Sequence, residues 1–96
     1  LGVTEKQNNL TGLAVVPNPV KNSATLRFSL NKKSNVTLTL IDFSGKEIWK
    51  SPKQELLSGT HETLLDVRQM SLKGGTYLLK VTANNSTRTV KFVYLP

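Results

Sequence analysis

Residues 74–94 read GGTYLLKVTANNSTRTVKFVY and carry the strongest indication of the fold of this 96-residue chain. Apolar side chains occupy every second position in both halves of the stretch: Tyr77, Leu79, Val81, then Val90, Phe92 and Tyr94. A period of two places alternate side chains on opposite faces of a strand, so each half predicts a half-buried β-strand. Asparagine tolerates the left-handed conformation of tight turns, and Asn84-Asn85 lies between the halves. The stretch therefore predicts a β-hairpin.

The same alternation continues upstream in shorter segments. It covers residues 25–30, 36–40 and 63–67, and shorter apolar segments lie at 13–16 and 46–50. Turn residues separate these segments at a spacing of roughly 8–12 residues, which is typical of a β-sandwich. Residues 51–59 show no pattern, and we expect a loop that crosses between two sheets. We predict an all-β fold, an immunoglobulin-like β-sandwich of about seven antiparallel strands.

Composition favours strands over helices. Valine, isoleucine and threonine supply 22 residues and alanine only three, and β-branched side chains pack well on a pleated sheet. A chain of this length buries roughly 65% of its unfolded surface, enough for one core. Cysteine is absent, which excludes disulfides and a thiol nucleophile. The longest apolar run, Leu13–Val16, is too short to span a membrane.

The first twelve residues differ from the rest. Leu1–Gly12 is polar and aperiodic, so we read 1–12 as a flexible linker and 13–96 as the folded domain. The chain starts at leucine and carries no basic-then-apolar leader. We therefore expect it to be a piece of a longer precursor.

Charge is the next guide to partners. Thirteen basic residues against six acidic ones give a net charge of +7, which favours anionic partners. A single-strand nucleic-acid binder also needs exposed aromatic side chains. Here Phe28, Tyr77, Phe92 and Tyr94 share a face with aliphatic residues, and the lysines are dispersed. We therefore predict a solvated basic surface and no nucleic-acid partner.

Catalytic and metal-binding patterns are weak. His61 is the only histidine, with Glu62 and Asp66 as candidate orienting acids and Ser58 or Thr60 as candidate nucleophiles. A catalytic triad needs three such groups to converge in a cleft, whereas these residues follow one another along a single segment. The acids are too scattered for a metal site. We predict no enzyme activity, no metal and no cofactor.

Trp49 is the candidate ligand-binding residue. If Ile48 points inward, Trp49 points outward and is available to a sugar or a partner; the opposite parity buries it. The short strand leaves both orientations open. An outward Trp49 motivates an alternative function, a fibronectin-like spacer or carbohydrate-binding module of a surface enzyme.

Four motifs in order add a family resemblance. They are Pro17-Asn18-Pro19, Asp42-Phe43-Ser44-Gly45-Lys46, Leu72-Lys73-Gly74-Gly75-Thr76-Tyr77, and a basic-apolar last strand that contains Lys91. Together they resemble the type A C-terminal sorting domains of the type IX secretion system of Bacteroidota, over about Leu13 to Pro96. The chain departs from the family pattern at Val16, where tyrosine is usual, at Lys73, where proline is common, and in its last residues, Tyr94-Leu95-Pro96.

The resemblance implies a function as an address. Such domains direct an upstream cargo through the periplasm and across the outer membrane to the cell surface, by way of a translocon and a carrier. In many members a sortase-like cysteine peptidase then cuts ahead of the first strand and joins the cargo to an anionic lipopolysaccharide. Cleavage would then fall within residues 1–12.

The resemblance also names recognition residues: Pro17, Asn18, Pro19, Asp42, Gly45, Gly74, Gly75, Tyr77 and Lys91. Proline and glycine also make turns, and Tyr77 resembles the tyrosine corner of immunoglobulin-like sandwiches, so these residues also have a structural explanation. The edge strands and the hairpin Thr76–Tyr94 are the surfaces that a carrier could read. The sequence leaves open the cargo, the bond that is cut, the component that reads the domain, and whether it forms a homodimer.

Overall fold

The computed structural model describes residues 9–96, and in this range the chain forms eight strands and one 3₁₀ turn. All strand pairs are antiparallel. The elements are β1 (Leu10–Val16), β2 (Ala24–Leu30), β3 (Ser34–Asp42), β4 (Glu47–Lys50), β5 (Gln54–Leu56), β6 (Gly59–Leu65), η1 (Val67–Met70), β7 (Gly75–Ala83) and β8 (Ser86–Tyr94).

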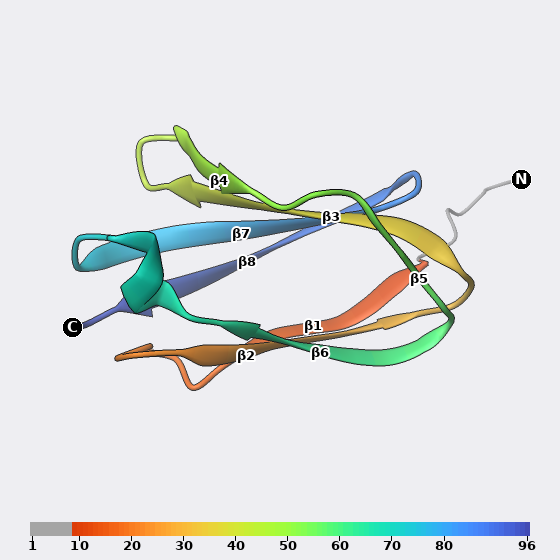
Figure 1. Cartoon of the computed structure of the whole chain (residues 1–96), viewed down its shortest axis with the longest axis horizontal. Coiled ribbons are helices and arrows are strands. Elements are labelled where there is room, and N and C mark those ends of the chain that lie inside the picture. The colour runs from red at the N-terminus through yellow and green to blue at the C-terminus, as the bar shows by residue number, and fades with distance from the viewer. Residues whose placement is uncertain (1–8) are drawn as a thin grey trace, which may run out of the picture.

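The strands form two sheets that face each other (Figure 1). The smaller sheet has the order β1-β2-β6. The larger has the order β4-β3-β7-β8, and β5 pairs with the same side of β3 further along. This arrangement confirms the predicted all-β, immunoglobulin-like sandwich. No helix in the described part of the chain is long and apolar enough to cross a membrane.

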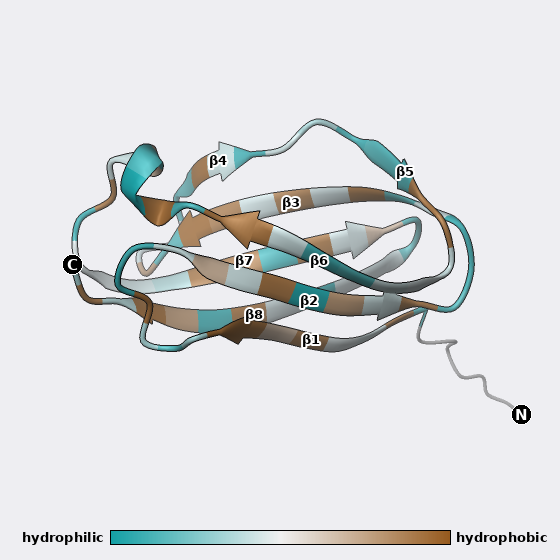
Figure 2. Cartoon of the chain, turned by 60° about the horizontal axis from the view of Figure 1, so that its bottom comes forward, coloured by the Kyte–Doolittle hydropathy of each residue, from teal (hydrophilic) through white to brown (hydrophobic). Residues whose placement is uncertain are grey.

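The core lies between the sheets and is built by strand alternation. Figure 2 shows apolar and polar bands alternating along the central strands. Phe28 and Leu26 from β2 are fully buried, as are Leu79 from β7 and Phe92 from β8.

Truncating such a side chain removes its burial and leaves a cavity. We therefore expect Phe28→Ala to cost about 3–5 kcal/mol of stability.

The predicted hairpin is confirmed. β7 and β8 pair without a register shift from Gly75 opposite Tyr94 to Ala83 opposite Ser86. Asn84 takes the left-handed conformation with a φ of 54°. Its backbone N–H donates to the Asn35 carbonyl at the start of the neighbouring strand β3, and its Oδ1 accepts from the Asn35 N–H, both at 3.0 Å. The turn is thus tied to β3.

The first strand begins earlier than expected. β1 starts at Leu10, not Leu13, because Leu10 is fully buried opposite Leu30. The three residues before Leu13, which the sequence reading gave to the linker, therefore lie in β1. A register shift between Thr11 and Ala14, around Gly12, interrupts the alternation and hides this start in the sequence. Residues 1–8 of the predicted linker lie outside the described residues.

Two further segments differ from the prediction. Residues 51–59 were expected to form only a loop, yet β5 forms there, with Leu56 opposite Ser34 and Gln54 opposite Val36. The strand predicted over 63–67 is β6, which ends at Leu65. Val67 is buried as predicted, but it lies in the 3₁₀ turn η1 and not in a strand.

Candidate functional site

The four sequence motifs come together at one end of the sandwich. Pro17–Pro19 follows the end of β1, the turn that begins at Asp42 joins β3 to β4, Gly74-Gly75 leads into β7, and the fourth motif, the basic-apolar strand β8, ends here at Tyr94. Within the larger sheet Asp42 pairs with Tyr77 and Gly75 with Tyr94, and Val20, just after Pro19, forms a bridge with Tyr94, so these segments lie on the same side. We call this group of four segments the motif end; it lies at the left of Figure 1, beside the carboxyl terminus.

Asn18 binds the edge of the last strand. Its Nδ2 donates to the backbone carbonyl of Lys91 at 3.2 Å, and its Oδ1 accepts from the Val93 N–H at 3.0 Å. Val20 continues this contact: its N–H donates to the Val93 carbonyl at 2.7 Å, and its carbonyl accepts from Leu95 at 2.8 Å. The segment after β1 therefore covers the outer edge of β8. Asn18 and Lys91, 73 residues apart, are in direct contact.

Asp42 organises the hairpin between β3 and β4. Its Oδ1 accepts from the Ser44 hydroxyl at 2.6 Å and from the backbone N–H groups of Ser44 and Lys46 at 2.9 and 3.0 Å. The bond from the Ser44 hydroxyl, followed by that from the Lys46 amide, lowers the pKa of the Asp42 carboxyl below its ordinary value. Gly45 takes a φ of 95°, which residues with a Cβ rarely adopt.

The Gly74–Tyr77 segment forms a corner against the end of the chain. The Tyr77 hydroxyl donates to the backbone carbonyl of Lys73 at 2.5 Å, and its ring stacks on Phe92 with centroids 5.8 Å apart. A Cβ on Gly74 would lie 3.0 Å from the Pro96 ring and 3.4 Å from the Tyr94 carbonyl oxygen. Glycine at this position therefore lets the last residues pack closely.

The motif end also exposes apolar side chains that sequence reasoning missed. Phe43 at the hairpin tip is 80% exposed, and Val16 and Leu95 are about half exposed. None of the three belongs to the core cluster. Phe43 stands between Asp42 and Ser44 in a turn, where a phenylalanine has no strand face to fill. That position is the sequence signal that would have found it.

Trp49 points towards the core side of the larger sheet. It pairs with Leu40, which is fully buried, and directly opposed residues of antiparallel strands point to the same face. Trp49 is half-buried and packs against the core, whereas Ile48 is 39% exposed. The isolated outward tryptophan that motivated a sugar-binding module is therefore not observed.

His61 and Glu62 do not pair as a base and its orienting acid. The His61 Nε2 lies 2.6 Å from the Leu57 carbonyl, and its ring lies against Phe28. Glu62 points to the other face of β6, where its Oε2 accepts from the Arg27 Nε at 2.9 Å. Among residues 9–96, no three His, Asp or Glu side chains are grouped to hold a metal ion.

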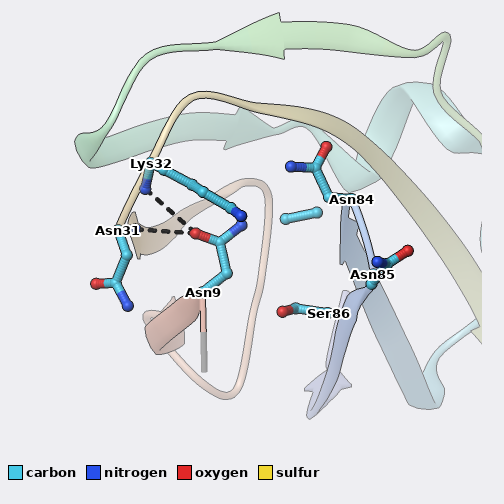
Figure 3. A pocket seen from close by; sticks show the side chains of 7 residues that line it. Asn9, Asn31, Lys32, Asn84, Asn85 and Ser86 are labelled. Carbon is cyan, nitrogen blue, oxygen red and sulfur yellow. Dashed lines mark hydrogen bonds between the residues drawn. The ribbon is translucent and has the colours of Figure 1, made fainter. Parts of the chain in front are cut away.

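The opposite end of the sandwich, which we call the Asn9 end, consists of Asn9 and the turns 31–33 and 84–85. Asn9 is buried; its Oδ1 accepts from the backbone N–H groups of Asn31 and Lys32, both at 3.2 Å (Figure 3). Its Nδ2 donates to the Ser34 Oγ at 2.7 Å. A polar hollow of about 230 Å³ separates Asn9 from Asn84, Asn85 and Ser86. Asn9 thus fixes the start of β1 to the β2–β3 turn.

Comparison with known proteins gives one family. Residues 14–94 match a family model described as a secretion system C-terminal sorting domain. A search of curated proteins gives no match. The match covers all four motifs and nearly the whole described chain.

Proposed function

Because this chain belongs to the family of secretion-system C-terminal sorting domains, we propose that the motif end is the surface by which the export machinery recognises it. The domain is a C-terminal sorting signal of the type IX secretion system. It interacts with that machinery, and the cargo that it accompanies is exported to the cell surface or secreted. The family consists of sorting signals and is not catalytic.

One observation carries the proposal: four motifs far apart in the sequence converge on one end of the fold. A contact that only stabilises the sandwich has no need for exposed apolar side chains, yet Phe43, Val16 and Leu95 project there. Exposed apolar groups rimmed by polar residues are typical of protein interaction sites. We assign Asn18, Asp42, Gly45, Gly74 and Tyr77 to holding this surface in shape.

The family resemblance supports further steps. We propose that the domain crosses the periplasm folded and that a sortase-like cysteine peptidase then cuts ahead of Asn9, joining the cargo to an anionic lipopolysaccharide. Peptidases bind extended, accessible backbone, whereas Asn9 is buried and bonded to the β2–β3 turn. Residues 1–8 are therefore the proposed cleavage region. Because the Asn9 end and the motif end are opposite, the machinery can hold one end while the peptidase acts at the other (Figure 1).

The experiment is a comparison of exposed apolar substitutions on an exported reporter. Phe43→Ser and Leu95→Ser leave the core intact, so we expect stability within about 0.5 kcal/mol of the wild type. Surface display of a reporter fused to the domain should fall at least severalfold. Leu57→Ser is the matched control, since Leu57 is 69% exposed and lies near the Asn9 end. Normal display of the double variant would contradict the proposal.

A further inference from the structure

The sandwich leaves one long strand edge bare. Among the described strands, β8 has its outer edge covered by Asn18 and Val20, and β1 carries a register shift and lies beside β8. β4 and β5 are only four and three residues long, and Pro52 lies between them. β6 pairs with β2 over seven residues without a shift, and no described strand lies on its other side. The hairpin edge expected to be readable is thus covered, and β6 is open.

β6 carries few of the usual protections of an edge. Edge strands commonly carry charged side chains, above all lysine, or proline or a bulge, which discourage pairing with another chain. The sequence of β6, GTHETLL, contains neither lysine nor proline, its one charged residue, Glu62, pairs with Arg27 of β2, and its register is regular. Its unpaired backbone groups therefore form a template for a further strand.

An apolar groove runs beside this edge. A cavity of about 440 Å³ lies where the two sheets diverge, lined among others by Phe28, Leu38, Trp49, Pro52 and Thr63. Thr63 lies opposite buried Leu26 and so faces the space between the sheets, yet it is exposed, because the short strands β4 and β5 do not cover it. A strand added next to β6 would point every second side chain into this groove.

A second hollow continues from the groove at Trp49. It is about 480 Å³ and is lined by Ile48, Trp49, Asp66, Gln69 and Met70. The Oδ1 of Asp66 is shielded from solvent and accepts no hydrogen bond within the described chain. A buried acceptor of this kind calls for a donor, and rotation of the carboxylate presents either oxygen. A lysine or arginine side chain here would bond Asp66 and lie against the Trp49 indole.

Charge indicates the same ligand. All five acidic residues of the described chain lie between Asp42 and Asp66, accompanied by three lysines. The rest of residues 9–96 contains no acid and nine basic residues: Lys21, Arg27, Lys32, Lys33, Arg68, Lys73, Lys80, Arg88 and Lys91. Two of these five acids already pair with basic residues, Glu62 with Arg27 and Glu55 with Lys33. The groove is lined by one charged residue, Lys53, and the second hollow also by one, Asp66, so Asp66 is the group that is complementary to a basic side chain of a partner.

We propose that this open flank, formed by β6, Trp49, Thr63 and Asp66, binds an extended basic-apolar strand of a partner protein. The added strand pairs with the backbone of β6, places apolar side chains in the groove, and places one lysine or arginine between Asp66 and Trp49. The identification of the partner as a component of the export machinery rests on the proposed function. The geometry of strand docking on β6 is independent of that function.

The test uses a synthetic peptide of seven residues, with threonine at positions one, three, five and seven, valine at positions two and four, and arginine at position six. Trp49 is the only tryptophan, so its fluorescence reports on the site directly, and hydrogen exchange reports on the β6 amides. We expect binding that slows exchange along β6. Replacing the arginine by glutamate, or methylating the pairing amides of the peptide, should weaken binding at least tenfold. Equal binding of all three peptides, or no binding, would overturn the proposal.

Protein variants separate the parts of the site. Asp66→Asn should weaken binding of the arginine peptide severalfold but leave binding of a peptide with norleucine in place of arginine unaffected. Thr63→Lys should weaken binding of both peptides at least tenfold. The matched control is Thr87→Lys, at an exposed position on β8, and this variant should bind both peptides as the wild type does. Concentration-dependent protection of β6 without any peptide would mean that a second copy of the chain occupies the flank, and would overturn the choice of partner.

An export assay connects the site to the machinery. A reporter carrying Thr63→Lys should stay inside the cell envelope, whereas the Thr87→Lys reporter should reach the surface. Normal export of both would exclude the machinery as the partner. Retention of the wild-type reporter would contradict the proposed function instead, and the peptide measurement would still decide on the open flank.

Discussion

Asn18 acts at the residue scale as a substitute for strand backbone. Its amide bonds the Lys91 carbonyl and the Val93 N–H, two groups that would otherwise be unpaired at the edge of β8. Asn18→Ala removes both bonds, and each is worth roughly 0.5–1.5 kcal/mol. We expect a loss of about 1–3 kcal/mol in the free energy of unfolding, measured by chemical denaturation. Asn22→Ala is the control, because Asn22 is exposed and makes no such bond. Equal stability of the two variants would show that the edge closure does not matter.

Asp42 makes the stability of the domain depend on pH. Its pKa in the folded domain is lowered by the Ser44 hydroxyl and the Lys46 amide, so folding favours the carboxylate. The contribution of Asp42 to stability is complete above the ordinary carboxyl pKa, and it is lost as the pH falls through the lower pKa of the folded state. We therefore expect wild type and Asp42→Asn to converge in stability as the pH is lowered below about 4. A gap in melting temperature that stays constant from pH 7 to pH 3 would contradict this assignment.

At the scale of elements, the last strand holds both the core and the motif end. β8 supplies Phe92 and Tyr94 to the core and the edge that Asn18 and Val20 cover. Deletion of Arg88–Pro96 should therefore unfold the domain, seen as loss of amide dispersion, and leave the cargo in the periplasm. Asn18→Ala keeps β8 and should remain folded. Normal surface display after the deletion would argue against both roles.

Sequence predicted some elements well because their apolar pattern is local. The β7–β8 hairpin has an unbroken period of two and an Asn-Asn turn, and it folds in the expected register. β1 was predicted to start too late, because the shift around Gly12 breaks the period. β5 has only three residues and no periodicity to detect. The orientation of Trp49 depends on its pairing with Leu40, and a four-residue strand does not encode that register.

At the scale of the whole molecule, the motifs acquire a shared location that no single motif predicts. Pro17–Pro19 and Lys91 are far apart in sequence, and only the antiparallel topology brings them into contact. The exposed Phe43 and the bare edge of β6 likewise become visible only when the sheets are assembled. The net charge of +7 likewise does not predict that Asp66 is the only charged residue lining the hollow beside Trp49. Side-chain identity predicts the fold; assembly determines which surfaces stay open.

The central claim is that this folded domain is by itself sufficient as an address for type IX export. The measurement is to attach residues 1–96 behind a signal peptide and a fluorescent reporter, in bacteria with and without a working type IX translocon. We predict surface fluorescence only in the competent strain, with the new carboxyl end of the reporter, read by mass spectrometry, lying before Asn9. Periplasmic fluorescence in both strains, with the domain intact, would contradict the claim.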